Sequence, residues 1–296
     1  MNSPRAFAAA CPVHDRRRRR GDPVVTGAGS GLGEAGARRL AREEARIVVA
    51  NVDGAAAQRV ADEINRAGGE AAPYEVDVVS LEDTRRLVEF TVATYGRLDI
   101  AFNNAGVTPR PVDAHEIAPA EWLRVIDVNL TGAFACMQAE LAHFVAHSGG
   151  AIVNMASTAG VMAHAGRAAY AGSKHGVVGL TRSAAVEYAR LGIRVSAVAP
   201  GPIDAPSARA LPPEVRAAIA AKTAMNRTGA GVTGGQGVMW PCRRRAGSPA
   251  PGRRTARTPR SGERGVHRRC RGQPSVSAEA SPGLSTTPLA VTASTP

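Results

Sequence analysis

A tyrosine and a lysine lie four residues apart, at Tyr170 and Lys174. On a helix this spacing places both side chains on one face. A free phenol titrates near pH ~10, too high for proton exchange at neutral pH, and a neighbouring ammonium favours its ionised form. The pair could therefore exchange a proton with a substrate oxygen, and Ser157, at the end of a predicted strand, could hold that oxygen. A Tyr–Lys pair taken alone is more often an ordinary surface pair on a helix.

A glycine-rich segment, Thr26 to Gly33 (TGAGSGLG), lies between the first predicted strand and the first predicted helix. Glycine allows a tight turn and a close approach of the backbone to a phosphate, while a helix N-terminus offers free N–H groups and the positive end of its dipole. The segment therefore predicts a pyrophosphate site. A purely structural turn is the alternative, because loops often hold several glycines. The spacing also differs from the G-x-G-x-x-G form of the dinucleotide fold.

Short apolar runs alternate with longer amphipathic stretches between Pro23 and about Met225. Strands are expected at 24–26, 47–51, 72–77, 98–103, 151–156 and 193–199, and helices at 36–44, 55–67, 81–95, 120–145 and 170–190. Apolar strands that do not alternate with polar residues are typical of a parallel sheet covered on both faces. The sequence thus predicts an α/β fold with a doubly wound parallel sheet, which must position the residues above.

The positive charge lies at the two ends of the chain. The net charge is +12 over 296 residues; residues 1–22 hold six Arg and two Asp, and residues 226–296 hold twelve Arg and two Glu, which leaves −2 between them. A nearly neutral centre argues against nucleic-acid binding by the folded part. No run approaches the ~18–20 apolar residues of a membrane span, so an integral membrane protein is excluded.

The four cysteines lie far apart and form no C-x-x-C pair. This spacing argues against a disulfide scaffold and a zinc-ribbon site, so a reducing, cytoplasmic location is expected. His143 and His147 have the i, i+4 spacing of metal ligands, but no third ligand is evident. A solvated helix face explains them better, and no metal site is predicted.

Composition divides the chain into three parts. Residues 1–22 are expected to form a basic, disordered leader without the apolar segment of a signal peptide. Residues 23–240 are expected to form one folded domain. Residues 226–296 hold eight Pro, eleven Gly and seven Ser, with Trp240 as their only aromatic. Such a segment buries too little apolar surface to offset chain ordering, so 241–296 is predicted to be a disordered tail.

Further motifs follow the glycine segment along the chain. They are Asp77-Val78 after the third strand, Asn103-Asn104-Ala105-Gly106 after the fourth, Asn129 in a V-N-L-T-G run, Ser157 thirteen residues before Tyr170, the Y-x-x-x-K run from Tyr170 to Lys174, and Pro200-Gly201 after the sixth strand. With the G-x-x-x-G-x-G spacing, this set resembles the short-chain dehydrogenase/reductase (SDR) family over residues 24–229. The resemblance implies a Rossmann-like fold and makes 23–240 a dinucleotide-binding catalytic domain.

The resemblance also implies a bound nicotinamide dinucleotide. Its phosphates would lie at Gly27, Ser30, Gly31, Leu32 and Gly33, its adenine at Asp77 and Val78, and its ribose near Asn103, Ala105 and Gly106; Tyr170, Lys174, Pro200, Gly201 and Ile203 would contact it as well. An acid at the end of the second strand favours NAD, because it repels a 2′-phosphate. Asn51 stands there and can bond a ribose hydroxyl, and no basic residue occupies position 30 or 52. NAD is therefore expected rather than NADP.

The implied activity is hydride transfer between NAD(P) and a small secondary alcohol or ketone. Tyr170 would be the acid/base, and Lys174, with the charge of the nicotinamide, would favour its phenolate. Ser157 would hold the carbonyl oxygen. By resemblance, Asn129 would anchor a water that connects Lys174 to solvent. Family members form homodimers or homotetramers, whereas the segments expected to line the substrate pocket are too mixed to identify a substrate.

Three departures from the family pattern leave other hypotheses open. The first strand is short, Ala205 stands where a Thr commonly holds the nicotinamide amide, and the family's last strand is missing or degraded. Abrupt Arg and Pro enrichment suggests ends read in a shifted frame of GC-rich DNA. One alternative is thus a non-catalytic SDR-like product whose sheet ends at the sixth strand and whose oligomer is lost. Another is an Arg-rich tail that binds nucleic acid.

Overall fold

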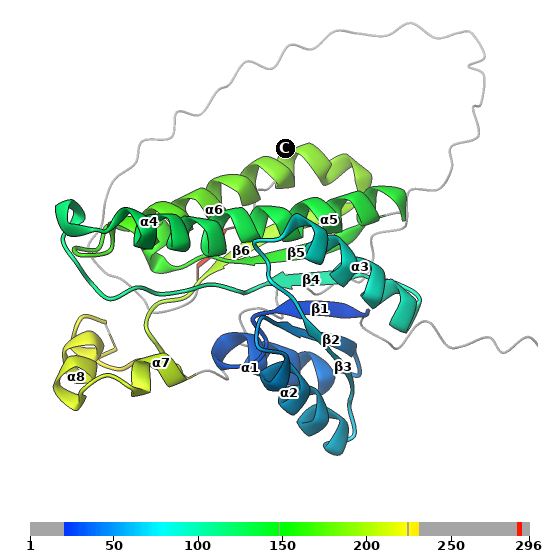
Figure 1. Ribbon diagram of the computed structural model, residues 1–296, viewed down its shortest axis with the longest axis horizontal. Coiled ribbons are helices and arrows are strands. Elements are labelled where there is room, and N and C mark those ends of the chain that lie inside the picture. Colours follow the sequence, from blue (N-terminus) through cyan, green and yellow to red (C-terminus); the bar gives the residue numbers. More distant parts are fainter. Residues whose placement is uncertain (1–20, 148, 224, 231–288, 292–296) are drawn as a thin grey trace, which may run out of the picture.

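Six parallel strands form the centre of the protein, in the order β3-β2-β1-β4-β5-β6 (Figure 1). They are β1 (Pro23–Thr26), β2 (Arg46–Asn51), β3 (Glu70–Glu75), β4 (Ile100–Asn103), β5 (Gly150–Met155) and β6 (Ile193–Ala199). The computed structural model describes residues 21–147, 149–223, 225–230 and 289–291. The strand order reverses between β1 and β4, and sheets of this kind bind ligands outside the carboxyl ends of the strands at such a reversal.

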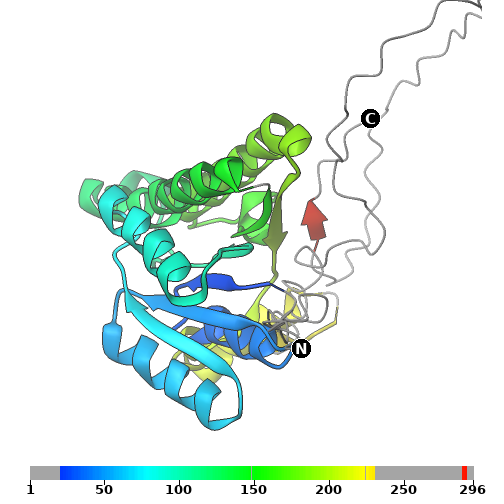
Figure 2. The ribbon, with the colours of Figure 1, turned by 90° about the vertical axis from the view of Figure 1, so that its right-hand side faces the viewer.

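Helices cover both faces of the sheet, which confirms the doubly wound prediction. On one face lie α1 (Gly31–Ala41) and α2 (Gly54–Arg66); on the other lie α3 (Leu81–Tyr95), α4 (Pro119–Ile126), α5 (Gly132–Ala146) and α6 (Ala168–Tyr188) (Figures 1 and 2). The two middle strands, β1 and β4, are buried along their whole length between these helices, whereas β3 at the edge is partly exposed. The carboxyl ends of the strands and the starts of the helices then share one edge of the sheet.

Neighbouring residues of each strand supply two separate cores. Val25 and Phe102 belong to the core beneath α1 and α2, while Val24 and Ala101, one position earlier, belong to the core beneath α3 and α5. Successive side chains of a strand point to opposite faces, so a strand buried on both sides must be apolar throughout. This explains why the predicted strands showed no alternation of apolar and polar residues.

Two predicted helices differ from the observed ones. The helix expected at 120–145 is interrupted by a π-helical turn, Asp127–Thr131, between α4 and α5. The turn inserts extra backbone without breaking the apolar pattern, so it could not be recognised from that pattern. The helix expected from Gly36 begins earlier, at Gly31, with Ser30 at its N-cap position, although glycines in the first turn lower helix propensity.

Residues from both the predicted leader and the predicted tail pack against the sheet. Residues 1–20 of the predicted leader lie outside the described residues, but Asp22 is 2% exposed and its carboxylate accepts a 2.9 Å hydrogen bond from Arg46. Most of the predicted tail also lies outside the described residues. Its residues Leu289–Val291 form β9, which pairs antiparallel with β6 (Figure 2). A three-residue reversed strand agrees with a degraded last strand, but it corrects the expectation that β6 ends the sheet.

A small lobe follows β6 at the carboxyl edge of the sheet (Figure 1). It contains β7 (Ile203–Asp204), α7 (Pro206–Arg209), α8 (Pro213–Ala221) and β8 (Gly229–Ala230), and β7 pairs with β8. Ile203, one of the predicted cofactor contacts, therefore belongs to this two-stranded ladder. Within the described part of the chain, no helix is both long enough and apolar enough to cross a membrane.

Candidate active site

The glycine loop turns sharply between β1 and α1 and touches the end of β4. Gly27 and Gly31 have φ angles of 61° and 60°, in the left-handed region that glycine adopts without strain. A Cβ on Gly27 would lie 2.8 Å from the Cα of Ala105, and a Cβ on Gly33 would lie 2.2 Å from the carbonyl oxygen of Gly27. Glycine is therefore required at these positions for the loop to pack against the sheet.

Thr26 and Asn104, which sequence reasoning did not single out, fasten this loop to β4. The hydroxyl oxygen of Thr26 accepts hydrogen bonds from the backbone N–H groups of Asn104 and Ala105, at 3.1 and 3.2 Å. The side-chain amide of Asn104 donates to the carbonyl oxygens of Thr26 and Gly27, at 3.2 and 3.1 Å. The only signal in the sequence was the Asn103-Asn104 pair, which does not say which asparagine faces the loop.

The side chain of Asn103 faces away from the loop, so any contact of this residue with the cofactor would come from its backbone. It is 4% exposed, and its amide nitrogen donates to the Glu140 carboxyl at 2.9 Å and to the Asn154 side-chain oxygen at 3.1 Å. Its own side-chain oxygen has no hydrogen-bond partner among the described residues. Because adjacent residues at a strand end point in opposite directions, Asn104 takes the position beside the loop.

The start of α1 offers uncommitted donors to an anion. Ser30 occupies the N-cap position with extended backbone, and its exposed side chain makes no capping hydrogen bond. The first N–H groups of a helix have no partner within it, and they lie at the positive end of the helix dipole. This donor set, formed by Ser30 and the Gly31, Leu32 and Gly33 backbone, suits a pyrophosphate.

The residues expected at the adenosine end lie at the carboxyl ends of β2 and β3. The Asn51 side-chain oxygen accepts a 3.4 Å hydrogen bond from the N–H of Gly29, and its nitrogen donates to the Asp53 carbonyl at 3.2 Å. Asn51 is thus engaged with the glycine loop. Asp77 is exposed, with one oxygen accepting from the Val79 N–H at 3.0 Å, while Val78 is buried in the second core.

Lys174 is buried beside Tyr170 in α6, so the two do not form an ordinary surface pair. Lys174 is 3% exposed, and its Nζ donates a 2.8 Å hydrogen bond to the carbonyl oxygen of Met155 at the end of β5. The same Nζ lies 5.8 Å from the centre of the half-buried Tyr170 ring. Removal from water lowers the pKa of Lys174 to about 8, because burial disfavours the charged ammonium.

Ser157 reaches the same region from the end of β5. It begins the 3-10 turn Thr158–Gly160, and its hydroxyl oxygen accepts a 3.1 Å hydrogen bond from the Ala159 N–H. A Cβ on Gly160 would lie 2.7 Å from the carbonyl oxygen of Lys174, so this turn packs directly on α6. The N–H of Thr158 donates to the Pro200 carbonyl at 3.0 Å, which brings the Pro200-Gly201 segment alongside.

Asn129 lies in the π-helical turn and is 1% exposed. Its side-chain oxygen accepts from the Val107 N–H at 2.7 Å, and its nitrogen donates to the Val107 carbonyl at 2.9 Å and to the Ser173 hydroxyl at 3.2 Å. π-helical turns occur frequently at functional sites. Here the turn joins the loop after β4 to α6, one residue before Lys174.

Gly106 lies close to both Asn129 and Lys174. A Cβ on Gly106 would lie 3.0 Å from the side-chain oxygen of Asn129 and 3.5 Å from Nζ of Lys174. A side chain at position 106 would therefore crowd both polar groups. The amide oxygen of Asn129 accepts a hydrogen bond from Val107 and has a second lone pair for a further donor.

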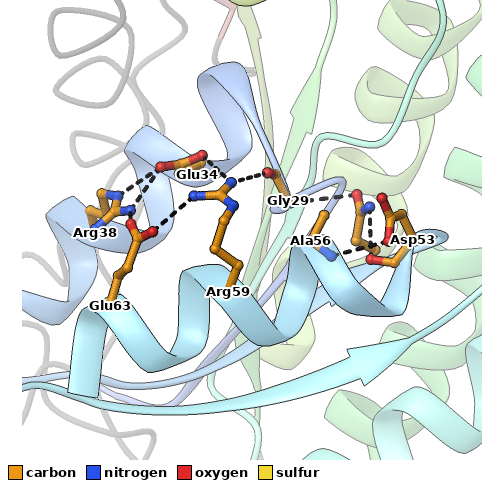
Figure 3. A network of polar contacts seen from close by, with 8 residues as sticks. Gly29, Glu34, Arg38, Asp53, Ala56, Arg59 and Glu63 are labelled. Atoms are coloured by element: carbon orange, nitrogen blue, oxygen red, sulfur yellow. Dashed lines mark hydrogen bonds and ion pairs between the residues drawn. The ribbon is translucent and has the colours of Figure 1, made fainter. Parts of the chain in front are cut away.

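Arg59 is a residue of the site region that sequence reasoning missed. It lies on α2, thirty residues beyond the loop, and its Nη2 donates a 2.8 Å hydrogen bond to the Gly29 carbonyl (Figure 3). A basic residue that binds a 2′-phosphate was expected at position 30, in the loop, or at position 52, directly after β2. The spacing of Arg59 from Glu63 marks a helical ion pair, but it does not show that the arginine also reaches the loop.

Comparison with known proteins gives the same family as the motifs. The short chain dehydrogenase family model matches residues 23–216. A cyclohexanol dehydrogenase of Acinetobacter sp. (strain SE19) is 45% identical over 183 residues, which are 62% of this chain and 73% of that protein. A cis-4-hydroxycyclohexanecarboxylate dehydrogenase of Sinomonas cyclohexanicum is 42% identical over 204 residues, 69% of this chain and 82% of that protein.

A solved structure has the same architecture. The crystal structure of gox2181 superposes with a TM-score of 0.72 at 31% sequence identity, and the match covers 74% of this chain and 87% of that one. A 3-oxoacyl-[acyl-carrier-protein] reductase of Thermotoga maritima is 34% identical over 206 residues, 70% of this chain and 83% of that protein. The similarity thus extends to proteins with different substrates.

Proposed function

The chain belongs to the short-chain dehydrogenase/reductase family, and we propose that it transfers a hydride between a nicotinamide dinucleotide and a secondary alcohol or its ketone. Family membership makes the protein an oxidoreductase, and members of the family generally depend on NAD(P). The observation that carries the finer proposal is the buried Lys174 ammonium beside the Tyr170 ring, at the carboxyl edge of the sheet. Burying a lysine costs free energy of folding, so its presence at this place favours a chemical role.

The residues divide the work of moving a proton to and from the substrate oxygen. A nicotinamide bound at this edge supplies or accepts the hydride. The hydroxyl of Ser157 donates a hydrogen bond that holds the substrate oxygen, and the phenol of Tyr170 gives or takes the proton at that oxygen. The ammonium of Lys174 favours the phenolate of Tyr170, because opposite charges stabilise each other at short range.

A water between Asn129 and Lys174 would complete the proton path. Both side chains lie close to position 106, so a water between them could accept a proton from Lys174 and pass it outward. This deepens the role expected for Asn129, whose side chain is otherwise engaged with Val107 and Ser173. Asn129 in this account holds the water and fixes the loop after β4.

NAD is the proposed cofactor in preference to NADP. Asn51 ends β2 and Asp53 follows it, so the polar groups nearest the expected ribose are an amide and a carboxylate. Arg59, which contacts the glycine loop, is paired with carboxylates. Separate titrations with NADH and NADPH, followed by nicotinamide fluorescence, test this choice. A lower Kd for NADPH than for NADH would contradict it.

A cyclic secondary alcohol is the proposed substrate class. Support comes from relatives whose names specify ring alcohols, among them the cyclohexanol and cis-4-hydroxycyclohexanecarboxylate dehydrogenases. The test is a panel of cyclic and linear secondary alcohols with NAD and NADP, followed by absorbance of the reduced nicotinamide. Turnover of ring alcohols supports the proposal. Cofactor binding without turnover of any alcohol would favour the alternative of a non-catalytic SDR-like protein.

A further inference from the structure

Four charged residues form a closed network between α1 and α2 (Figure 3). Glu34 and Arg38 lie on α1, and Arg59 and Glu63 lie on α2. Arg38 Nε donates to Glu34 at 2.9 Å and Arg38 also pairs with Glu63, while Arg59 donates to Glu34 at 3.1 Å and to Glu63 at 3.2 Å. Two guanidinium groups and two carboxylates cancel in charge, and each arginine bridges both acids.

Arg59 extends this network to the glycine loop. The Nη2 that pairs with Glu34 also donates the 2.8 Å hydrogen bond to the Gly29 carbonyl. On the other side of the same glycine, the Gly29 N–H is held by Asn51. A Cβ on Gly29 would lie 2.8 Å from the Cβ of Ala56, so α2 lies in close contact with the loop. The backbone of Gly29 is thus held at both its N–H and its carbonyl.

Glu34 creates an electrostatic problem at this place. It lies in the first turn of α1, and the N-terminus of α1 is where the proposed cofactor's phosphates would bind. A carboxylate there stabilises the helix dipole but repels a second anion. Hydrogen bonds to Glu34 and Glu63 raise the pKa of Arg59, and Arg38 and Arg59 together hold the pKa of Glu63 below its ordinary value. Glu63 therefore stays charged, and each of the two carboxylates is paired with both arginines.

We propose that Arg59 is a positioning residue for the dinucleotide: it fixes the Gly29 carbonyl of the phosphate-binding loop and cancels the charge of Glu34 beside the phosphate site. The inference rests on the proposed function, because it assumes a dinucleotide at the glycine loop. Arg59 acts through the loop and Glu34, so its loss weakens cofactor binding without altering proton transfer at Tyr170.

The first experiment is a fluorescence titration of the full chain with NADH and with NADPH, for wild type and Arg59→Met. The loss of one charge-assisted hydrogen bond and one compensating charge is expected to raise both Kd values roughly tenfold. The kcat at saturating cofactor stays at the wild-type value. The matched control is Arg86→Met, which breaks a single ion pair with Glu82 on α3, an exposed helix pair of the same i, i+4 type. Its Kd values are expected to equal those of wild type.

Two further variants separate positioning from a general loss of packing. Glu34→Gln placed in the Arg59→Met background removes the uncompensated charge, so it should restore part of the lost affinity. Arg59→Lys should bind the dinucleotide more weakly than wild type, because an ammonium does not bridge Gly29 and two carboxylates in fixed geometry. No gain from Glu34→Gln would overturn the electrostatic part of the proposal.

The remaining outcomes also decide the question. Unchanged Kd values in Arg59→Met would overturn the inference while leaving the proposed function intact. A loss confined to NADPH would overturn it as well, because Arg59 would then contact the added phosphate itself. If wild type binds neither dinucleotide at millimolar concentration, the proposed function fails before the inference is reached.

Discussion

Burial determines how Lys174 titrates. Desolvation is the cause that lowers its pKa to about 8. Between pH ~8 and ~10.5 the unfolded chain holds a proton that the folded chain has released, so the free energy of unfolding rises with pH across that window. Below pH ~8 the folded state bears the full cost of a buried ammonium. The residue is thus retained at the expense of stability, as expected for a group with a chemical task.

Lys174→Met should therefore make the protein more stable and inactive. At pH 7 the free energy of unfolding is expected to rise by roughly 1–3 kcal/mol, and the gain should shrink towards pH 10 as the wild-type lysine loses its proton. Urea unfolding at both pH values measures the difference. A variant less stable than wild type at pH 7 would show that the Met155 hydrogen bond outweighs desolvation.

Gly106→Ala tests the space between Asn129 and Lys174. The new Cβ would lie 3.0 Å from the Asn129 oxygen and 3.5 Å from Nζ of Lys174, so it would crowd a water that bridges the two groups. Turnover should fall by roughly tenfold or more, because a step of proton transfer is impeded. Gly179→Ala in α6 is the control, since a Cβ there meets no atom within 4 Å. Equal turnover in the two variants would remove the water from the mechanism.

The motifs indicate which residues could form a site, but not where each side chain points. Ser157, Tyr170 and Lys174 lie on elements that meet at one edge of the sheet, and their roles stay predictions. Strand geometry directs the Asn103 side chain into the interior, which the Asn103-Asn104 pair alone did not indicate. Arg59 escaped detection because its contact with Gly29 depends on how α2 packs.

At the scale of elements, a buried polar cluster joins α5 to β4 and β5. Glu140 on α5 is 1% exposed and accepts a hydrogen bond from Asn103, which also donates to Asn154 on β5. Desolvation raises the pKa of Glu140 to about 8, so the carboxyl is mainly protonated in the folded protein at neutral pH. The unfolded chain gives up that proton near pH ~4.5.

The contribution of Glu140 to the free energy of unfolding should therefore fall as pH rises. Between pH ~5 and ~8 the folded state holds one proton more than the unfolded state, so its contribution falls by about 1.4 kcal/mol per pH unit. Glu140→Gln has no titratable carboxyl at this position. Its free energy of unfolding, relative to that of wild type, should therefore increase with pH across the window. Thermal unfolding of both proteins at pH 5.5 and 8 is the measurement; a constant difference would place the carboxyl's pKa outside the window.

The bounds of the helices show which structural features depend only on nearby residues in the sequence. α3 was predicted at Leu81–Tyr95 and is found there, because Ser80 caps its start and Gly96, with φ of 80°, ends it. The π-helical turn between α4 and α5 was missed because it depends on the contacts of Asn129 with Val107, far away along the chain. Local caps can be recognised in a sequence, whereas tertiary hydrogen bonds cannot.

At the scale of the whole molecule, the proposed cofactor would lie across the reversal of strand order and contact both halves of the sheet. A ligand that binds only the folded state stabilises it by mass action. NADH at 100 times its Kd should add about 2.7 kcal/mol and raise the unfolding temperature by roughly 5–10 °C. A thermal scan with increasing NADH measures this. A midpoint that stays constant would mean that the folded chain does not bind the dinucleotide.

The architecture of the sheet followed from the alternation of apolar and amphipathic segments, but its last edge did not. Leu289–Val291 lies in a stretch whose composition predicted no strand, and its pairing with β6 depends on tertiary contact alone. The homodimer or homotetramer expected from the family stays a prediction, as do the domain limits at 23 and 240.

The most direct test of the account is a comparison of Tyr170→Phe with wild type, in both cofactor binding and turnover of a cyclic secondary alcohol. Loss of the hydroxyl removes the proposed acid/base, and turnover should fall by at least about a hundredfold. The Kd for NADH should stay within about twofold, since a phenyl ring fills the same place. A Tyr170→Phe protein that turns over alcohol at the wild-type rate would contradict the central claim.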